Sequence, residues 1–453
     1  MLYHLLFYTV FTFKVTNSFP SVQPVLCHDD ESSALLQFKQ NFAIKKFASD
    51  YFPSHPKTVS WIPKTDCCSW DGVECDDQTG HVIGLDLSSS QLYGSIGSNS
   101  SLFHLSQLQR LNLSHNHFNY SPIPSTLAHL SRLTHLDLSY SMFSGEIPKE
   151  ISQLSKLLIL DLCCNYVSSF PETNLLQLKQ QNLRSMIQNI TNLQVLYLCF
   201  VNISSPVPNT LSNVSSLHVL CLRSSGMYGD FPIGIFHLPN LRYLEVGDNK
   251  GLTGYLPEFH SSGALYYLGL QSTSFQGKLP ASLGNLNAFK VLAIRQCQFS
   301  GSIPSSLSNL TQLMVLDLAY NHFKGNLTSS LSNLTQLGVL SVGRNDITSK
   351  DISWIGKLNR LYSLDLSNVN IGSEIPNSFV NLTQLTTFAI EYGNLVGQIP
   401  SWIMNFTHLR NLDLSNNKLH GKLPHSIFSL GNLSVLYLCS NFLVGQFELN
   451  MIF

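Results

Sequence analysis

Apolar residues recur along this chain in triplets of an apolar residue, a variable residue and a second apolar residue. From Leu196 to Leu436 the triplets repeat every 24 residues, and one spacing of 36 residues separates Leu160 from Leu196. Alternate side chains of a strand face the same side, so each triplet predicts a short strand with one apolar face. A strand of this kind buries that face only against its neighbours, so the chain is expected to stack into a solenoid. The triplets begin at Leu85, Leu111, Leu136, Leu160, Leu196, Leu220, Leu244, Leu268, Leu292, Leu316, Leu340, Leu364, Phe388, Leu412 and Leu436.

A polar residue follows most triplets at a constant distance, three places after the second apolar residue. Inside a stack, an Asn side chain at this place pairs with backbone groups that would otherwise be buried without partners. We therefore expect a ladder of hydrogen bonds, interrupted at Val201, Val369 and Gly393. Asparagine holds the ladder position at Asn116, Asn165, Asn249, Asn321, Asn345, Asn417 and Asn441, and a smaller polar residue holds it at Ser90, Ser141, Ser225, Thr273 and Cys297.

After the ladder position, many repeats carry a glycine, a variable residue, an apolar residue and a proline. This motif lies at 145–148, 229–232, 254–257, 277–280, 301–304, 397–400 and 421–424. With the leucine period, it resembles the plant extracellular class of leucine-rich-repeat proteins over about residues 28–447. The resemblance implies an α/β leucine-rich-repeat solenoid, a right-handed superhelical horseshoe with a parallel concave β-sheet. It also implies a second short strand at each motif and a disulfide-bonded amino-terminal cap.

Three segments are expected. Residues 1–22 are expected to form a signal peptide, with an approximate boundary. The stretch before Lys14 is apolar and is too short to span a bilayer. Residues 23–80 form the cap, with a helical rhythm from Ala34 through Phe42. Residues 81–453 form about fifteen leucine-rich repeats, with a long repeat at 160–195 and an incomplete last repeat.

Four cysteines lie in the cap, at Cys27, Cys67, Cys68 and Cys75. Four cysteines allow three pairings, between which the spacing does not decide. The resemblance to the plant amino-terminal domain implies bonds between Cys27 and Cys67 and between Cys68 and Cys75. Disulfide bonds predict an oxidising compartment and therefore the secretory pathway.

The other six cysteines lie inside repeats. Cys163, Cys199 and Cys439 share one register, which raises the possibility of a metal site. Cys199 and Cys439 are ten repeats apart, however, or ~48 Å at ~4.8 Å per strand. We therefore expect no metal site and no cofactor, and we expect Cys297 to be a small buried residue.

Twelve Asn-x-Ser/Thr sequences support passage through the secretory pathway. Asn112 lies between two strand leucines and is expected to be less accessible than the others. Glycosylation is predicted at Asn99, Asn119, Asn189, Asn202, Asn213, Asn309, Asn326, Asn333, Asn381, Asn405 and Asn432.

Composition and motifs argue against two function classes. The net charge of −1 and the pI near 7.0 do not indicate a nucleic-acid-binding face. The chain has no phosphate-binding glycine loop, kinase signature or zinc-protease motif, so no catalytic residue is predicted. Asp137 and Asp161 are expected about 5 Å apart on adjacent strands, a spacing that a retaining glycosidase uses. The same triplet position holds Asp86 and Asp317, however, so a structural role is favoured.

Binding is expected on the concave face, at the positions between and after the strand leucines. The fold does not require particular residues there, and aromatic residues and arginines are typical of binding hot spots. The predicted ligand-binding residues are Tyr197, Phe200, Arg223, Glu245, Asp248, Gln271, Arg295, Gln296, Tyr320, Arg344, Glu391 and Tyr392.

The unit at 163–198 resembles the elongated early repeat of plant receptor-like proteins of the disease-resistance class. The resemblance implies an extracellular recognition domain for a peptide, protein or glycan, in immune or developmental signalling through a receptor-like kinase co-receptor. The chain is expected to end before a membrane span, since nothing after the leader approaches ~20 consecutive apolar residues. A plasma-membrane ectodomain is expected if a longer receptor exists, and a cell-wall or extracellular protein otherwise. The alternative is a secreted inhibitor of a microbial wall-degrading enzyme, similar to the polygalacturonase inhibitors.

Overall fold

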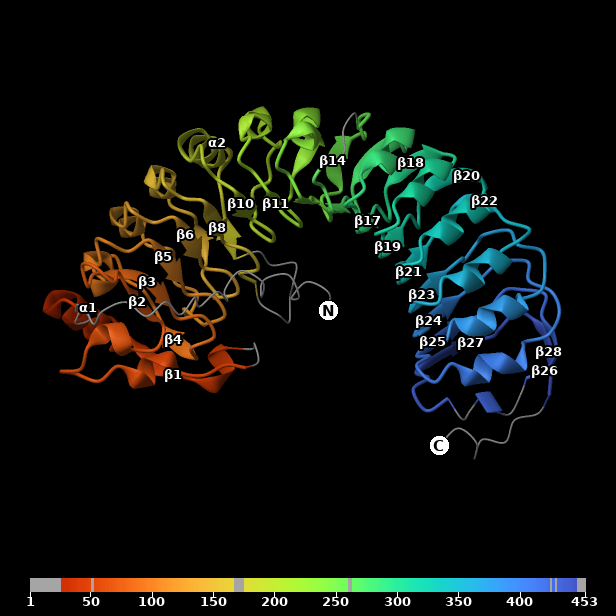
Figure 1. Cartoon of the computed structure of the whole chain (residues 1–453), viewed down its shortest axis with the longest axis horizontal. Coiled ribbons are helices and arrows are strands. Elements are labelled where there is room, and N and C mark those ends of the chain that lie inside the picture. Colours follow the sequence, from red (N-terminus) through yellow and green to blue (C-terminus); the bar gives the residue numbers. More distant parts are fainter. Residues whose placement is uncertain are drawn as a thin grey trace, which may run out of the picture.

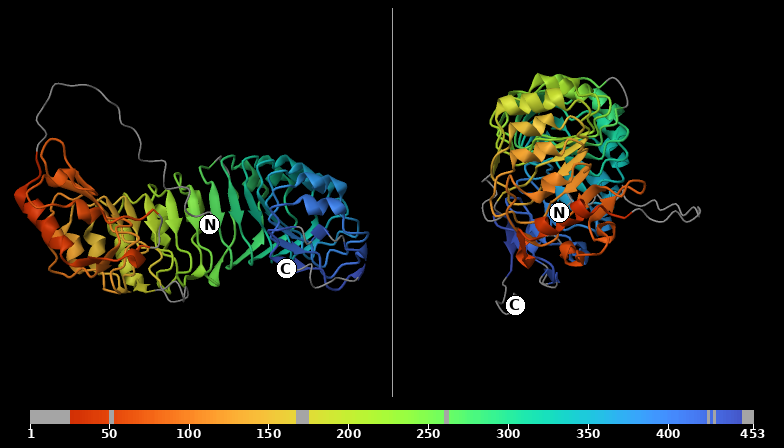
Figure 2. Two further views of the ribbon diagram at one scale, coloured as in Figure 1. Left: turned by 90° about the horizontal axis from the view of Figure 1, so that it is seen from below. Right: turned by 90° about the vertical axis from the view of Figure 1, so that its left-hand side faces the viewer.

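The computed structural model describes residues 26–49, 53–166, 175–259, 263–423, 426–427 and 430–445. The predicted signal peptide at 1–22 lies outside these residues. The described residues form an arc of stacked repeats with strands inside and helices outside (Figure 1). The view turned by 90° shows that the arc does not lie in a single plane (Figure 2). The predicted leucine-rich-repeat horseshoe is confirmed.

One sheet of sixteen strands lines the concave side. The first two residues of all fifteen predicted triplets lie in its strands, and the second apolar residue follows directly after each strand. Equivalent leucines face each other, as Leu220 faces Leu244. Neighbouring strands are parallel except for the first pair. In spatial order the strands are β2 (Val73–Cys75), β3 (Val82–Asp86), β5 (Arg110–Asn112), β6 (His135–Asp137), β8 (Ile159–Asp161), β10 (Val195–Tyr197), β11 (Val219–Cys221), β13 (Tyr243–Glu245), β15 (Tyr267–Gly269), β17 (Val291–Ala293), β19 (Val315–Asp317), β21 (Val339–Ser341), β23 (Ser363–Asp365), β24 (Thr387–Ala389), β25 (Asn411–Asp413) and β27 (Val435–Tyr437).

Shorter sheets form where the chain leaves the concave side. The glycine of the Gly-Pro motif lies in such a strand at six of the seven motifs, and Gly397 lies outside any strand. Gly277 has a φ of 93°, which a residue with a Cβ adopts only under strain. The strands are β12 (Tyr228–Asp230), β14 (Gly251–Gly254), β16 (Ser274–Lys278), β18 (Gln298–Gly301), β20 (His322–Asn326) and β22 (Asp346–Thr348) in one sheet, and the pairs β7 (Gly145–Glu146) with β9 (Leu176–Gln177), β26 (His420–Lys422) with β28 (Phe442–Val444), and β1 (Phe42–Ile44) with β4 (Leu92–Gly94).

Short 3-10 helices line most of the convex side. At five motifs the proline comes directly before such a helix, because its fixed φ suits the start of the helix; these prolines are Pro148, Pro232, Pro280, Pro304 and Pro400. The long repeat carries an α-helix instead, α2 (Gln180–Asn189). The 3-10 helices are Lys46–Ala48, Lys57–Ser60, Cys67–Ser69, Ser101–His104, Ser125–His129, Lys149–Gln153, Asn209–Asn213, Ile233–His237, Ala281–Asn285, Ser305–Asn309, Ser329–Asn333, Ser353–Lys357, Asn377–Asn381 and Ser401–Asn405.

The predicted ladder is present and explains how the turns are buried. The Asn249 amide donates to the carbonyls of Leu222, Val246 and Gly247 at 2.8, 2.8 and 3.1 Å. Its Oδ1 accepts from the backbone N–H groups of Ser225 and Met227 at 3.1 and 2.9 Å. Each asparagine therefore joins its own turn to the preceding one.

Smaller ladder residues make fewer bonds to the same carbonyls. The Ser225 hydroxyl donates to the Leu198 carbonyl at 2.8 Å. The Cys297 thiol donates to the Leu270 carbonyl at 3.0 Å, and Cys297 is buried as predicted.

The cap covers the first repeat. Its helix, α1 (Asp29–Lys39), begins five residues before the predicted rhythm and ends before Phe42, which lies in β1. The early start is due to three acidic residues in the first turn, which favour a helix N-terminus although they add no apolar rhythm. The Glu31 carboxylate accepts the Val82 N–H at 2.8 Å and so joins the helix to β3.

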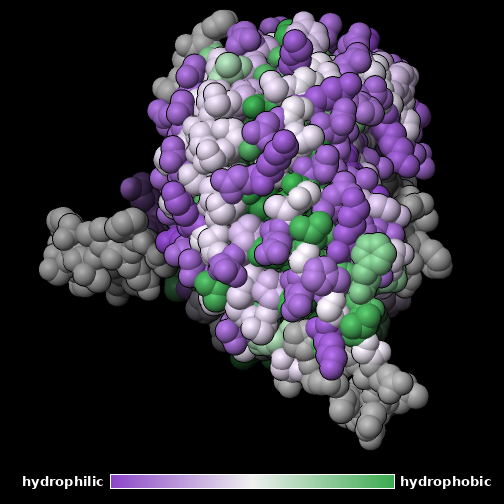
Figure 3. Space-filling model, turned by 90° about the vertical axis from the view of Figure 1, so that its right-hand side faces the viewer, coloured by the Kyte–Doolittle hydropathy of each residue, from purple (hydrophilic) through white to green (hydrophobic). Residues whose placement is uncertain are grey.

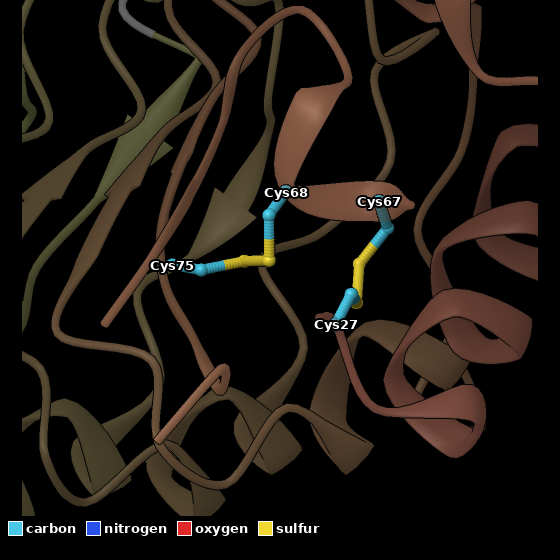
Figure 4. Close-up of side chains that lie close together, drawn as sticks. All are labelled: Cys27, Cys67, Cys68 and Cys75. Atoms are coloured by element: carbon cyan, nitrogen blue, oxygen red, sulfur yellow. A yellow bond between two sulfur atoms is a disulfide. The ribbon is translucent and has the colours of Figure 1, made fainter. Parts of the chain in front are cut away.

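Two disulfides join the parts of the cap, Cys27–Cys67 and Cys68–Cys75 (Figure 4). This is the pairing that the resemblance implies. The four sulfur atoms lie within 4.8 Å of one another. A metal site requires thiolates, which bonded cysteines do not provide, so this cluster is structural.

The last described repeat leaves apolar side chains exposed, including Phe442 and Val444. In the view of Figure 3 the surface is mainly hydrophilic, and hydrophobic residues gather near the lower end of this face. No described helix has the length and apolar content that a membrane span requires.

Candidate functional site

The residue before the ladder position adopts the left-handed backbone conformation in repeat after repeat, with φ between 50° and 65°. Asn and Gly tolerate this conformation, whereas larger residues are strained in it. Several predicted binding residues nevertheless stand there, among them Phe200, Tyr320, Arg344 and Tyr392. Their backbone is held by the next repeat, as the Tyr320 N–H donates to the Gly343 carbonyl at 3.0 Å. The fold therefore fixes the backbone from which these side chains extend at the rim of the concave face.

Replacing Tyr392 with asparagine is expected to raise the free energy of unfolding by about 0.5–1 kcal/mol, because asparagine relieves the left-handed strain. Tyr392 is 50% exposed at a φ of 54°, so little packing is lost. Urea unfolding measures the change. The matched control is Tyr228→Asn, in the extended strand β12, which should bring no gain. Equal effects of the two substitutions would rule out strain as the cause.

Several of the predicted binding residues contact one another over strands β17 to β24. The Arg295 guanidinium lies 4.6 Å from the centroid of the Tyr320 ring, and the Arg344 guanidinium lies 5.9 Å from it. Arg344 also forms an ion pair with Glu391. Tyr320 remains 43% exposed. This group, here called the arginine–tyrosine cluster, combines residue types that bind protein partners at hot spots.

A second gathering lies over β10 to β15, where Arg223 and Asp248 form an ion pair at 2.6 Å. Tyr197, Phe200 and Gln271 are partly exposed nearby. Gln296 is exposed, but it lies beside Arg295 rather than in this group.

Glu245 was expected on the open concave surface, but the structure buries it, with 1% of the residue exposed. Its carboxylate accepts from the Tyr267 hydroxyl at 2.7 Å, the Gln271 amide at 3.0 Å and the Gly247 N–H at 2.9 Å. Burial raises the pKa of Glu245 against these hydrogen bonds. Gly269 on the next strand makes room, since a Cβ there would lie 2.4 Å from the carboxylate. Glu245 therefore has a structural role, in which its hydrogen bonds join neighbouring repeats of the sheet.

Sequence reasoning missed two features of this face. A third disulfide joins Cys199 to Cys221 on neighbouring repeats, beside the buried thiols of Cys163 and Cys164. Tyr140 also stands before a ladder position, where its ring stacks on His115 at 4.7 Å. Reading the position before the ladder through every repeat would have found Tyr140. No spacing rule would have selected Cys221.

The aspartates of the triplets serve the turns. Asp137 accepts the Ser139 N–H at 2.9 Å and Asp161 accepts the Cys163 N–H at 2.9 Å, and the same bond recurs at Asp413 and Ser415. A recurring bond to the backbone two residues ahead is a structural role. Burial raises the pKa of Asp161 well above its usual range, and the facing Asp137 raises it further.

The contribution of Asp161 to stability is therefore expected to fall as the pH rises above the unfolded Asp pKa of about 3.9, because the folded Asp161 binds its proton more tightly. Asp161→Asn should flatten this decline and stabilise the protein at pH 7 by on the order of 1 kcal/mol. Asparagine fits, since Asn112 in the same register accepts the Ser114 N–H at 3.0 Å. Urea unfolding at acidic and neutral pH tests this, with Asp413→Asn, which has Ala389 and Tyr437 as strand neighbours, as the control. A gain that does not depend on pH would contradict the assignment.

All eleven predicted glycosylation sites are exposed. Many lie at the ends of the convex helices, as do Asn309 and Asn333. Asn112 is only partly exposed, and its Oδ1 is engaged by Ser114. Glycans at the convex sites would leave the arginine–tyrosine cluster uncovered.

Family models match two parts of the chain. The leucine rich repeat N-terminal domain matches residues 28–76. The leucine rich repeat matches 107–130, 132–154, 312–334, 360–382 and 408–430.

The chain is similar to plant receptor-like proteins. It is 38% identical to receptor-like protein 6 of Arabidopsis thaliana over 291 residues, which are 61% of this chain and 28% of that protein. It is 42% identical to receptor-like protein Cf-9 of Solanum pimpinellifolium over 295 residues, 63% of this chain and 33% of that protein. The chain thus matches about a third of the length of these relatives.

Among solved structures, the plant peptide hormone receptor RGFR1 in complex with RGF2 is similar, with a TM-score of 0.57 and 30% identity. The match covers 85% of this chain and 55% of that one.

Proposed function

We propose that this chain has an extracellular recognition function. It carries a leucine-rich-repeat amino-terminal domain and leucine-rich repeats, and it is similar to plant receptor-like proteins. The chain binds a peptide or protein on its concave face and reports it in immune or developmental signalling. The observation that carries this proposal is the arginine–tyrosine cluster, in which Arg295, Tyr320 and Arg344 are held in contact by separate repeats.

The physical basis is preorganisation. The strands and the ladder hold each side chain in place before a ligand arrives, so less conformational entropy is lost on binding. The similarity to a receptor solved with a peptide hormone supports a peptide as the ligand. Within this proposal, a partner kinase carries the signal onward.

The test is capture of peptides and proteins from plant extracellular fluid on the immobilised chain. A ligand should be retained by the native chain and lost from the Arg295→Ala, Tyr320→Ala, Arg344→Ala triple variant. The control is Arg132→Ala, Tyr228→Ala, Arg360→Ala, which removes the same side chains from exposed positions outside the cluster. A ligand retained equally by both variants would contradict the placement. Inhibition of a microbial polygalacturonase by the native chain would favour the inhibitor alternative.

A further inference from the structure

The arginine–tyrosine cluster continues over the rim of the solenoid. Arg344 also lines a hollow of about 530 Å³ together with Asn321, His322, Lys324, Asn345, Asp346 and Asn368. This hollow lies at the turns between the concave strands β19 and β21 and the strands β20 and β22 that follow them. We call Arg295, Tyr320, Arg344, His322 and Lys324 the rim strip.

The backbone beneath the rim strip is anchored on both sides. The chain turns at Asn321, whose amide donates to the Ile294 carbonyl at 2.8 Å. Phe323 is buried in the core, and its N–H donates to Asn345 Oδ1 at 3.0 Å. Tyr320 and His322 flank the ladder residue, and Lys324 follows on the exposed side of β20. The backbone that carries Tyr320, His322 and Lys324 is therefore anchored to the neighbouring repeats.

The charges along the rim strip are incompletely compensated. Among the described residues, no carboxylate forms an ion pair with Arg295 or Lys324, whereas Arg344 is paired with Glu391. Asp346 faces Lys324 from β22, and it is exposed. Asp317 lies near Arg295, and burial raises the Asp317 pKa although the charge of Arg295 lowers it. The Asp317 carboxylate accepts the Ala319 N–H and forms no ion pair with Arg295. Arg295 and Lys324 thus keep hydrogen-bond donors for an incoming anion.

We propose that the rim strip is a subsite for an acidic segment of a peptide or protein ligand. Carboxylate side chains of the segment bind Arg295 and Lys324, and its apolar atoms pack on Tyr320. The planar Arg295 guanidinium suits a carboxylate, with which it forms two parallel hydrogen bonds. Asn368 in the hollow offers an amide to the ligand backbone. The proposal rests on the proposed function and adds the charge of the ligand and its path over the rim.

The probe is a fluorescein-labelled hexaglutamate peptide, with hexalysine as its counterpart, and binding is followed by fluorescence anisotropy at low salt. We expect the native chain to bind hexaglutamate and not hexalysine. The Arg295→Ala, Lys324→Ala variant should bind roughly tenfold or more weakly, because two charge-assisted contacts are lost. The Arg132→Ala, Lys156→Ala variant makes the same change of net charge at exposed positions and should bind as the native chain does.

Three results would overturn the proposal. The first is no preference for hexaglutamate over hexalysine, and the second is an equal loss of binding in the control variant. The third is displacement of hexaglutamate by an oligogalacturonate of equal charge at a lower concentration, which would assign the subsite to an anionic glycan. If extracellular fluid yields a ligand without acidic side chains that the triple variant loses, the proposed function stands and this subsite falls. Thermal unfolding of each variant establishes that the fold is retained.

Discussion

Replacing Asn249 with alanine is expected to lower the free energy of unfolding by about 3–5 kcal/mol, because it leaves several buried backbone groups without partners. Asn249 is 1% exposed and makes five hydrogen bonds to the backbone. Its removal leaves the Leu222 and Val246 carbonyls and two N–H groups without these partners, whereas the Gly247 carbonyl still accepts the Ser224 N–H at 3.0 Å. A buried unsatisfied group costs about 1–3 kcal/mol. Partial rearrangement of the turn keeps the total below the sum.

Urea unfolding, followed by circular dichroism, measures this loss. Asn287→Ala is the matched control, because Asn287 is exposed outside the ladder, and its loss should stay within about 0.5 kcal/mol. Repeats unfold with limited cooperativity, so hydrogen exchange should show the loss first in the repeats around β11 and β13. A loss at Asn249 no larger than that of the control would mean that the ladder does not stabilise the stack.

Removing the Cys27–Cys67 disulfide with Cys27→Ser, Cys67→Ser is expected to destabilise the cap by about 4 kcal/mol, through the greater freedom of the unfolded chain. The bond closes a loop between residues 40 apart in sequence, and it ties the start of α1 to the segment before β2. The Cys68–Cys75 bond spans 7 residues, so its removal should cost less, about 2.5 kcal/mol.

Limited proteolysis under native conditions measures this difference, because cleavage within 28–66 reports opening of the cap. The Cys27→Ser, Cys67→Ser variant should be cleaved faster than the Cys68→Ser, Cys75→Ser variant. The first layer of repeats should then exchange amide hydrogens faster, since α1 covers it. The opposite order of cleavage would show that local strain, and not loop length, governs the stability of the cap.

The repeat period predicted the strands well because the requirement that sets it is local and repeated. Leu220 and Leu244 face each other since each triplet can bury its apolar face only against the next. The ladder followed for the same reason, because every buried turn poses the same hydrogen-bonding problem. The sequence predicted part of the candidate site. Arg295, Tyr320 and Arg344 were predicted from composition at variable positions, but their mutual contacts were not.

The errors arose where neighbours, and not position in the repeat, decide the environment. Glu245 occupies a variable position like its counterparts, yet Tyr267 and Gln271 from the next repeat enclose it. The start of α1 depends on acidic residues at the helix N-terminus, and the spacing of apolar residues carries no information about charge.

The sequence by itself determined the solenoid, the number and register of its repeats, the ladder and the side of the sheet on which binding residues are expected. These follow from periodicity, because a residue's place in a 24-residue unit sets its direction relative to the core. The tertiary structure alone decided which variable residues meet. The Arg344–Glu391 pair, the Cys199–Cys221 bond and the hollow beside Lys324 all join different repeats. Such contacts depend on the distance and orientation between neighbouring turns, which no single repeat encodes.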